Sequence, residues 1–223
     1  MIYLKTNGST IEHTFCSVIN ITGSQCSMRS LVEVLNHINA IKEDITTLSE
    51  RELTRLMIGE YGYIYQNLSL FDGMTLKENI SVAMAQRMTL NEANEYLSGI
   101  ADKLNILGNW NKHPYMEISK SVLQRCACAR AIVSNSDFIV TDEPEDHEEA
   151  IQLIEILKLI NIDYGKAILL VTKGAESASY FSRVLILKDD RIIKDLCRNG
   201  RSRSEFCDMI TNIIKLNKSE LKH

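Results

Sequence analysis

The sequence is poor in proline and has no long apolar run. Its 223 residues include only two prolines and ten glycines, which argues against a loop-rich or low-complexity chain. No apolar run approaches the roughly 20 residues that a membrane-spanning helix needs. The first residues also lack the apolar core of a signal peptide. We therefore expect a cytoplasmic chain, for which any role at a membrane comes through a partner.

Paired cysteines and a strong charge of one sign are absent as well. The six cysteines include no C-x-x-C pair, and Cys126 and Cys128 lie in an apolar segment, so we expect buried free thiols in a reducing compartment rather than disulfides or a metal site. The formal net charge of −4 gives no electrostatic reason to expect nucleic acid as a partner. The 45% of apolar residues are enough for one full core.

The segment from Ile118 to Pro144 carries the most informative pattern. It opens with serines at a helix start, continues through a helix of small apolar residues, and ends in an apolar strand at 138–140 that is followed by Asp142 and Glu143. A wholly apolar strand is typical of a parallel sheet covered on both faces, and ligands gather at the carboxyl ends of such strands. Both carboxylates are therefore predicted to lie at that edge of a sheet.

Near the N-terminus, a strand, a loop of small residues and a helix follow one another. The strand is expected at about residues 14–21, and apolar residues recur at helical spacing from Leu31 to Ile38. A phosphate-binding loop belongs in this context, between a strand and the helix after it.

The loop itself departs from the phosphate-binding pattern G-x-x-x-x-G-K-S/T. Gly23 and Ser30 match, whereas Met28 replaces the second glycine and Arg29 replaces the lysine. A methionine brings a side chain into the crevice, and a positive φ there would add about 1–2 kcal/mol of strain. Arginine keeps the charge but is a broad planar group. Taken alone, the octapeptide favours a turn that binds nothing.

The remaining elements are predicted from hydrophobic periodicity and capping signals. Strands are expected at residues 1–5, 61–66, 166–173, 183–187 and 191–193, and helical structure at about 40–60, 68–125, 146–160 and after residue 202. The last two strands are expected to form a hairpin.

The order of these motifs resembles that of ABC transporter ATP-binding subunits. The ending Asp142-Glu143-Pro144 is similar to the Walker B strand of that family, and Gln66 resembles its Q-loop glutamine. Residues 118–125 are similar to its signature Leu-Ser-Gly-Gly-Gln-Gln-Gln-Arg, with both glycines and the first glutamine replaced. The likeness spans from about Cys16 to the C-terminus and points to the lipoprotein-release and antimicrobial-peptide-transport (bacitracin-type) branch.

The resemblance implies an α/β fold of the P-loop NTPase type. Such a fold has a mixed, mostly parallel sheet flanked by helices, with an inserted helical subdomain. Residues 1–223 would form a single nucleotide-binding domain. Its core would comprise 1–67 and 126–200, its helical subdomain about 68–125 and its C-terminal helix about 202–217.

The resemblance also implies which residues form the site. Those that would hold ATP are Gly23, Ser24, Gln25, Cys26, Ser27, Met28, Arg29, Ser30, Gln66, Ser119 and Asp142. Mg²⁺ would be held by Ser30, Gln66 and Asp142. Glu143 would orient the attacking water, although we expect it to be idle, and Lys173 stands where the family has a switch histidine.

The departures from the family pattern favour a degenerate subunit. We expect weak or absent binding of ATP and Mg²⁺, weak or absent hydrolysis, and an acidic run at 145–149 that disfavours the usual dimer contact. The implied partners are a membrane permease and a second ABC ATP-binding subunit, in a homodimer or heterodimer, at the cytoplasmic face of the membrane. Two alternatives stay open, namely a slow but genuine ABC-type ATPase and a soluble regulatory pseudo-ATPase with no permease.

Overall fold

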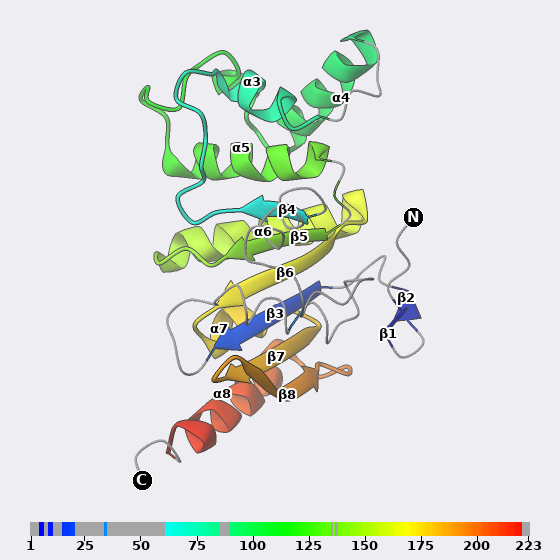
Figure 1. The fold of residues 1–223 in the computed structure, drawn as a ribbon, viewed down its shortest axis with the longest axis vertical. Coiled ribbons are helices and arrows are strands. Elements are labelled where there is room, and N and C mark those ends of the chain that lie inside the picture. The colour runs from blue at the N-terminus through cyan, green and yellow to red at the C-terminus, as the bar shows by residue number, and fades with distance from the viewer. Residues whose placement is uncertain are drawn as a thin grey trace, which may run out of the picture. The chain divides into compact units, whose positions relative to one another are not determined.

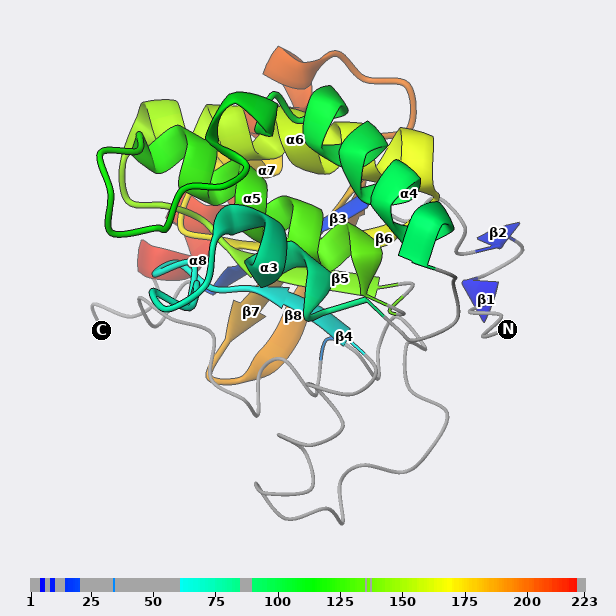
Figure 2. The same ribbon diagram turned by 90° about the horizontal axis from the view of Figure 1, so that it is seen from above.

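The computed structural model describes residues 5–6, 9–10, 15–20, 34, 61–84, 90–134, 136 and 138–219. The chain divides into two compact units, one formed by Met1–Arg55 with Ala167–His223 and the other by Leu56–Lys166. Figures 1 and 2 show the elements of each unit. The helices predicted at residues 31–38 and 40–60 lie outside the described residues, except for Val34, which is helical and buried.

The unit Leu56–Lys166 combines two parallel strands with several helices. Strand β4 (Tyr61–Ile64) pairs in parallel with β5 (Phe138–Asp142), so that both strands end at the same edge. The helices are α3 (Leu76–Ser81), α4 (Leu90–Lys103), the 3-10 helix η3 (Leu107–Asn109), α5 (Lys120–Val133) and α6 (His147–Tyr164).

Helix α5 forms the centre of this unit because its side chains are small and apolar over most of its surface. It contacts α3, α4, α6 and β4, as Figures 1 and 2 show for α3 and β4. Cys126, Ala127, Cys128 and Ala129 are all buried in succession, as expected for a helix that is covered on every side. At Gly62 of β4, an added Cβ atom would lie 3.3 Å from the Ser134 Oγ atom, so glycine permits this close approach.

The other unit is a mixed sheet covered by helices. Strand β3 (Phe15–Asn20) lies between β6 (Ala167–Thr172) and β7 (Arg183–Lys188) and is parallel to both. The predicted hairpin is confirmed, since β8 (Arg191–Cys197) runs antiparallel to β7. The remaining elements are the antiparallel pair β1 (Lys5–Thr6) and β2 (Ser9–Thr10), the short helix α7 (Ala175–Ala178) and α8 (Arg203–Ser219).

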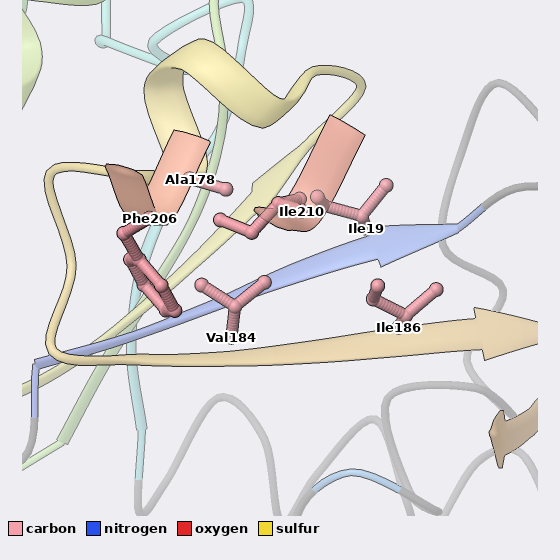
Figure 3. Packing of buried hydrophobic residues seen from close by; sticks show 6 residues of the cluster. All are labelled: Ile19, Ala178, Val184, Ile186, Phe206 and Ile210. Carbon is pink, nitrogen blue, oxygen red and sulfur yellow. The ribbon is translucent and has the colours of Figure 1, made fainter. Parts of the chain in front are cut away.

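A hydrophobic cluster joins α7 and α8 to the strands of this unit. Figure 3 shows its members, which are at most 1% exposed: Ile19, Ala178, Val184, Ile186, Phe206 and Ile210. The apolar face of α8 explains why a helix with a charged outer surface packs here. The cluster packs α7 and α8 on β3 and β7, which are paired in parallel.

One prediction at the level of elements is wrong. The chain from Leu68 to Arg125 is not helical throughout, because residues 65–75 and 110–119 form loops. The first loop is held by Asn79 of α3, whose side-chain amide donates to the carbonyl oxygens of Phe71 at 3.0 Å and Met74 at 3.1 Å and so satisfies backbone groups that a helix would otherwise pair.

The prediction of buried cysteines is correct only in part. Cys16, Cys126 and Cys128 are buried free thiols, and burial raises the pKa of each to about 12. Cys197 is exposed and Cys207 is half-buried, because they lie on an exposed strand and on a partly exposed helix. Cys26 lies outside the described residues. Across the part of the chain that the structure describes, we find no helix with the length and apolar character to span a bilayer.

Candidate functional site

A cavity of about 120 Å³ lies at the carboxyl ends of β4 and β5. Gln66, which follows β4, and Asp142, the last residue of β5, both line it. Their proximity follows from the parallel pairing of the two strands. The remaining charged lining comes from the starts of α5 and α6, through Lys120, Glu145 and Glu149.

The Asp142 carboxylate is held by a tyrosine of the neighbouring strand. The Tyr63 hydroxyl donates to Asp142 Oδ2 at 2.9 Å. Burial raises the pKa of Asp142 above its ordinary value, and the hydrogen bond from Tyr63 partly opposes that rise. Sequence analysis missed Tyr63, although it stands in an alternating Tyr-x-Tyr-x-Tyr run before Gln66. Its ring packs against Tyr65 with the centroids 4.3 Å apart.

Replacing this tyrosine should alter the titration of Asp142. We expect Tyr63→Phe to raise the pKa of Asp142 further, because it removes the hydrogen bond that favours the carboxylate. An acid whose folded-state pKa is raised binds its proton more tightly in the folded state. The variant should therefore lose stability relative to the native chain at neutral pH and regain it as pH falls through the folded-state pKa. Carboxyl ¹³C NMR titration measures the shift, and an unchanged or lowered pKa would contradict it.

Lys120 occupies a glycine position of the signature pattern, and its side chain pairs within the unit. Lys120 Nζ lies 2.6 Å from Glu149 Oε2, and the two side chains are 65% and 23% exposed. An ion pair this exposed contributes only about 0–1 kcal/mol to stability, so its main effect is to orient the lysine side chain. It turns the lysine toward α6, and Glu149 compensates its charge.

Ser119 caps α5, as the serine pattern predicts. Its hydroxyl oxygen accepts from the Val122 amide at 3.4 Å, which satisfies one of the unpaired donors at the helix start. Asp146 does the same for α6, with its Oδ1 atom 2.9 Å from the Glu149 amide. The acidic run 145–149 thus begins a helix, and Glu148 and Glu149 occupy its first turn.

The structure places the other predicted site residues less completely. Glu143 is half-buried directly after β5, in the unit Leu56–Lys166. Lys173 is exposed directly after β6, in the other unit. The phosphate-loop residues Gly23 to Ser30 lie outside the described residues, so their assignment stays a prediction.

The side-chain oxygen atoms that line the cavity are suited to bind a hard cation. The carboxylate of Asp142 and the amide oxygen of Gln66 are of the kind that Mg²⁺ binds, usually together with phosphate oxygens of a substrate. Among the residues that the structure describes, no group of three or more His, Cys, Asp or Glu is arranged to hold a metal ion. Gln66 and Asp142 therefore fit an Mg²⁺ ion that brings further ligands with it.

Comparison with protein families identifies the class to which this site belongs. Residues 23–146 match the family model described as ABC transporter. The chain belongs to the ABC transporter family and is an ATP-binding subunit, as the order of its motifs indicated. Members of this family use ATP and Mg²⁺, and their cassettes dimerise and pair with membrane permeases.

Its relatives include ATP-binding proteins of export systems. It is 34% identical over 174 residues to the ABC transporter ATP-binding protein YvcR of Bacillus subtilis, covering 76% of this chain and 66% of that protein. It is 31% identical over 204 residues to the bacitracin export protein BceA of Halalkalibacterium halodurans, covering 86% and 79%. It is 29% identical over 183 residues to the macrolide export ATP-binding/permease protein MacB of Campylobacter jejuni, covering 80% of this chain and only 28% of MacB.

Solved structures confirm the predicted fold class. The dimeric bacterial ABC transporter cassette MJ0796 matches with a TM-score of 0.62 at 21% identity, covering 84% of this chain and 87% of that one. Protein cbiO1 of Clostridium perfringens matches with a TM-score of 0.66 at 16% identity, covering 93% and 83%. The fold is therefore that of ABC cassettes, with a mixed, mostly parallel sheet flanked by helices.

Proposed function

We propose that this chain is a degenerate ATP-binding subunit of an ABC transporter complex, with weak or absent hydrolysis of ATP. The observation that carries the proposal is the pairing of Lys120 with Glu149 at 2.6 Å. In the family that this chain resembles, a glycine at the position of Lys120 lets backbone N–H groups approach a phosphate held by a partner subunit. A lysine side chain obstructs that approach, and its charge already has a carboxylate partner.

The phosphate loop supports the same proposal from the sequence. Met28 and Arg29 replace the glycine and lysine that would wrap and neutralise the phosphates, and Lys173 replaces a histidine that would accept and donate hydrogen bonds. Losing one preorganised donor costs about 2.7–4 kcal/mol, or roughly 10²–10³ in rate. Two or three such losses would make a typical turnover of about 1–100 s⁻¹ negligible, even with non-additivity.

The role that remains is structural. The chain would pair with an intact ATP-binding subunit or with a second copy of itself and dock on a permease at the cytoplasmic face of the membrane. Its relation to the bacitracin export protein BceA and the macrolide export protein MacB supports a task in export. We propose that the compounds exported or resisted are antimicrobial peptides or lipid-linked compounds. The proposal includes the division into a core at 1–67 and 126–200, a helical subdomain at about 68–125 and a C-terminal helix at about 202–217.

Phosphate release from Mg²⁺-ATP by the purified chain tests the proposal. We expect the native chain and Glu143→Gln to release phosphate at the same background rate, because Glu143 has no productively held nucleotide to act on. Glu148→Gln, which changes an exposed glutamate in the first turn of α6, is the matched control. Release that depends on nucleotide and is abolished only by Glu143→Gln would establish the alternative of a slow but genuine ATPase. That alternative draws support from Gln66 and Asp142, which share one cavity.

The second alternative, a soluble regulatory pseudo-ATPase, differs in its partners. A permease that co-purifies with the tagged chain from detergent-solubilised membranes would support the transporter role. If this membrane fraction yields none and a soluble complex is recovered instead, the regulatory role is favoured.

A further inference from the structure

The turn after Gln66 has an unfavourable backbone conformation. Leu68 and Ser69 are consecutive non-glycine residues with positive φ angles of 61° and 42°. Residues other than glycine rarely adopt this left-handed backbone region, and such conformations persist where surrounding contacts impose them. Local hydrogen bonds help, because the Leu68 amide donates to the Tyr65 carbonyl and the Ser69 amide to the Asn67 carbonyl, each at 2.8 Å.

A single side chain from α5 holds both strained residues. The Arg130 guanidinium donates through Nη1 to the Ser69 carbonyl oxygen at 2.7 Å and through Nη2 to the Leu68 carbonyl oxygen at 3.0 Å. Arg130 is half-buried, and burial lowers its pKa, so these bonds form in a partly desolvated setting where they are stronger than in water. The planar fork of arginine suits two adjacent acceptors in a way that a lysine ammonium does not.

The same helix also lines the cavity. Lys120 and Gln124, in the first turns of α5, border the cavity with Gln66, whereas Arg130 lies about 15 Å along the helix axis from Lys120 and about 9 Å from Gln124. Gln66 stands two residues before Leu68 in the sequence. Helix α5 thus supplies part of the cavity wall and, through Arg130, forms hydrogen bonds with the turn that follows Gln66.

We propose that Arg130 is a positioning residue, which fixes the Gln66 turn to α5 and thereby aims the Gln66 amide at the cavity. Any effect of Arg130 on nucleotide chemistry rests on the proposed role of Gln66. The effect of Arg130 on the position of Gln66 does not depend on nucleotide. A displacement of the signature end of α5 would then be passed to Gln66 through the two carbonyl contacts.

Hydrogen–deuterium exchange of the full chain without nucleotide tests the inference. In Arg130→Met, amides of residues 67–71 should exchange about 10–100-fold faster, as expected when two charge-assisted hydrogen bonds are lost. Amides of β5 should change less than about twofold. Arg130→Lys should show a smaller rise confined to the same turn, because lysine can still donate to one of the carbonyls. Arg191→Met, at an exposed arginine of β8, is the matched control.

A second readout follows Gln66 itself. The side-chain amide resonance of Gln66, assigned with Gln66→Glu, should shift in Arg130→Met and not in Arg191→Met. Unchanged exchange of residues 67–71 in a folded Arg130 variant would overturn the inference, as would a uniform rise across α5 and β5. If Arg130→Met fails to fold, Arg130→Lys decides by the same criteria. Because no nucleotide is present, these outcomes do not depend on the ATPase result with Glu143→Gln.

Discussion

Met28→Gly combined with Arg29→Lys is expected to raise the affinity of the chain for Mg²⁺-ATP by about 100-fold or more. A glycine removes the side chain from the crevice and tolerates positive φ, so that backbone amides can approach the phosphates. A lysine restores a compact charge in place of a planar fork. Recovering one preorganised donor corresponds to about 2.7 kcal/mol, which is a factor of about 100 in the dissociation constant.

The gain is measured by competition against a fluorescent nucleotide analogue. Each single variant should fall between the native chain and the double variant, and Met116→Gly, at an exposed methionine of the loop before α5, should leave the affinity unchanged. A double variant no better than the native chain would mean that the substitutions in the phosphate loop do not limit binding.

Phe206→Ala is expected to destabilise the chain by about 3–5 kcal/mol. The Phe206 side chain is fully buried in the cluster that joins α8 to Val184 and Ile19, so truncation leaves a cavity that the strands cannot fill by small shifts (Figure 3). Such a loss is a large part of the stability of an ordinary domain. The free energy of unfolding in urea, followed by circular dichroism, gives the effect.

The chain offers a matched control for this substitution. Phe71→Ala makes the same change at a side chain that is 53% exposed, where we expect a cost within about 0.5 kcal/mol. If Phe206→Ala and Phe71→Ala lower the free energy of unfolding equally, the burial of Phe206 in this cluster does not stabilise the chain as we expect. Phe206→Leu should fall between the two, because it leaves a smaller cavity.

Strands and caps of this fold could be predicted from the sequence because their signals are local. The strands at 138–142, 167–172 and 183–188 are buried on both faces, and this burial is visible in the sequence as a nearly continuous run of apolar residues. The structure also contains a capping box of Thr75 and Glu78, whose Thr-x-x-Glu spacing is one of the capping signals of the sequence. The resemblance implied that Gln66 and Asp142 share a site, and the structure gives the reason, because the parallel strands β4 and β5 present their carboxyl ends together.

The contacts that tune the site could not be predicted, because they join residues far apart in the sequence. Tyr63 donates to a carboxylate 79 positions away, and Arg130 reaches carbonyls 61 and 62 positions earlier. Neither residue belongs to a spacing pattern that marks such a partner. The loop at 68–75 was predicted as helix for a related reason, since the Asn79 side-chain amide pairs the carbonyl oxygens of Phe71 and Met74 without any helical spacing signal.

A calorimetric titration of the native chain with ATP in excess Mg²⁺ tests the central claim most directly. The claim is that substitutions in the phosphate loop and signature have removed productive nucleotide binding from an ABC fold that is otherwise retained. We predict no saturable heat in the micromolar range, and the same flat trace for Asp142→Asn. Saturable heat at micromolar nucleotide, lost in Asp142→Asn, would contradict the claim and restore ATP as a ligand of this chain.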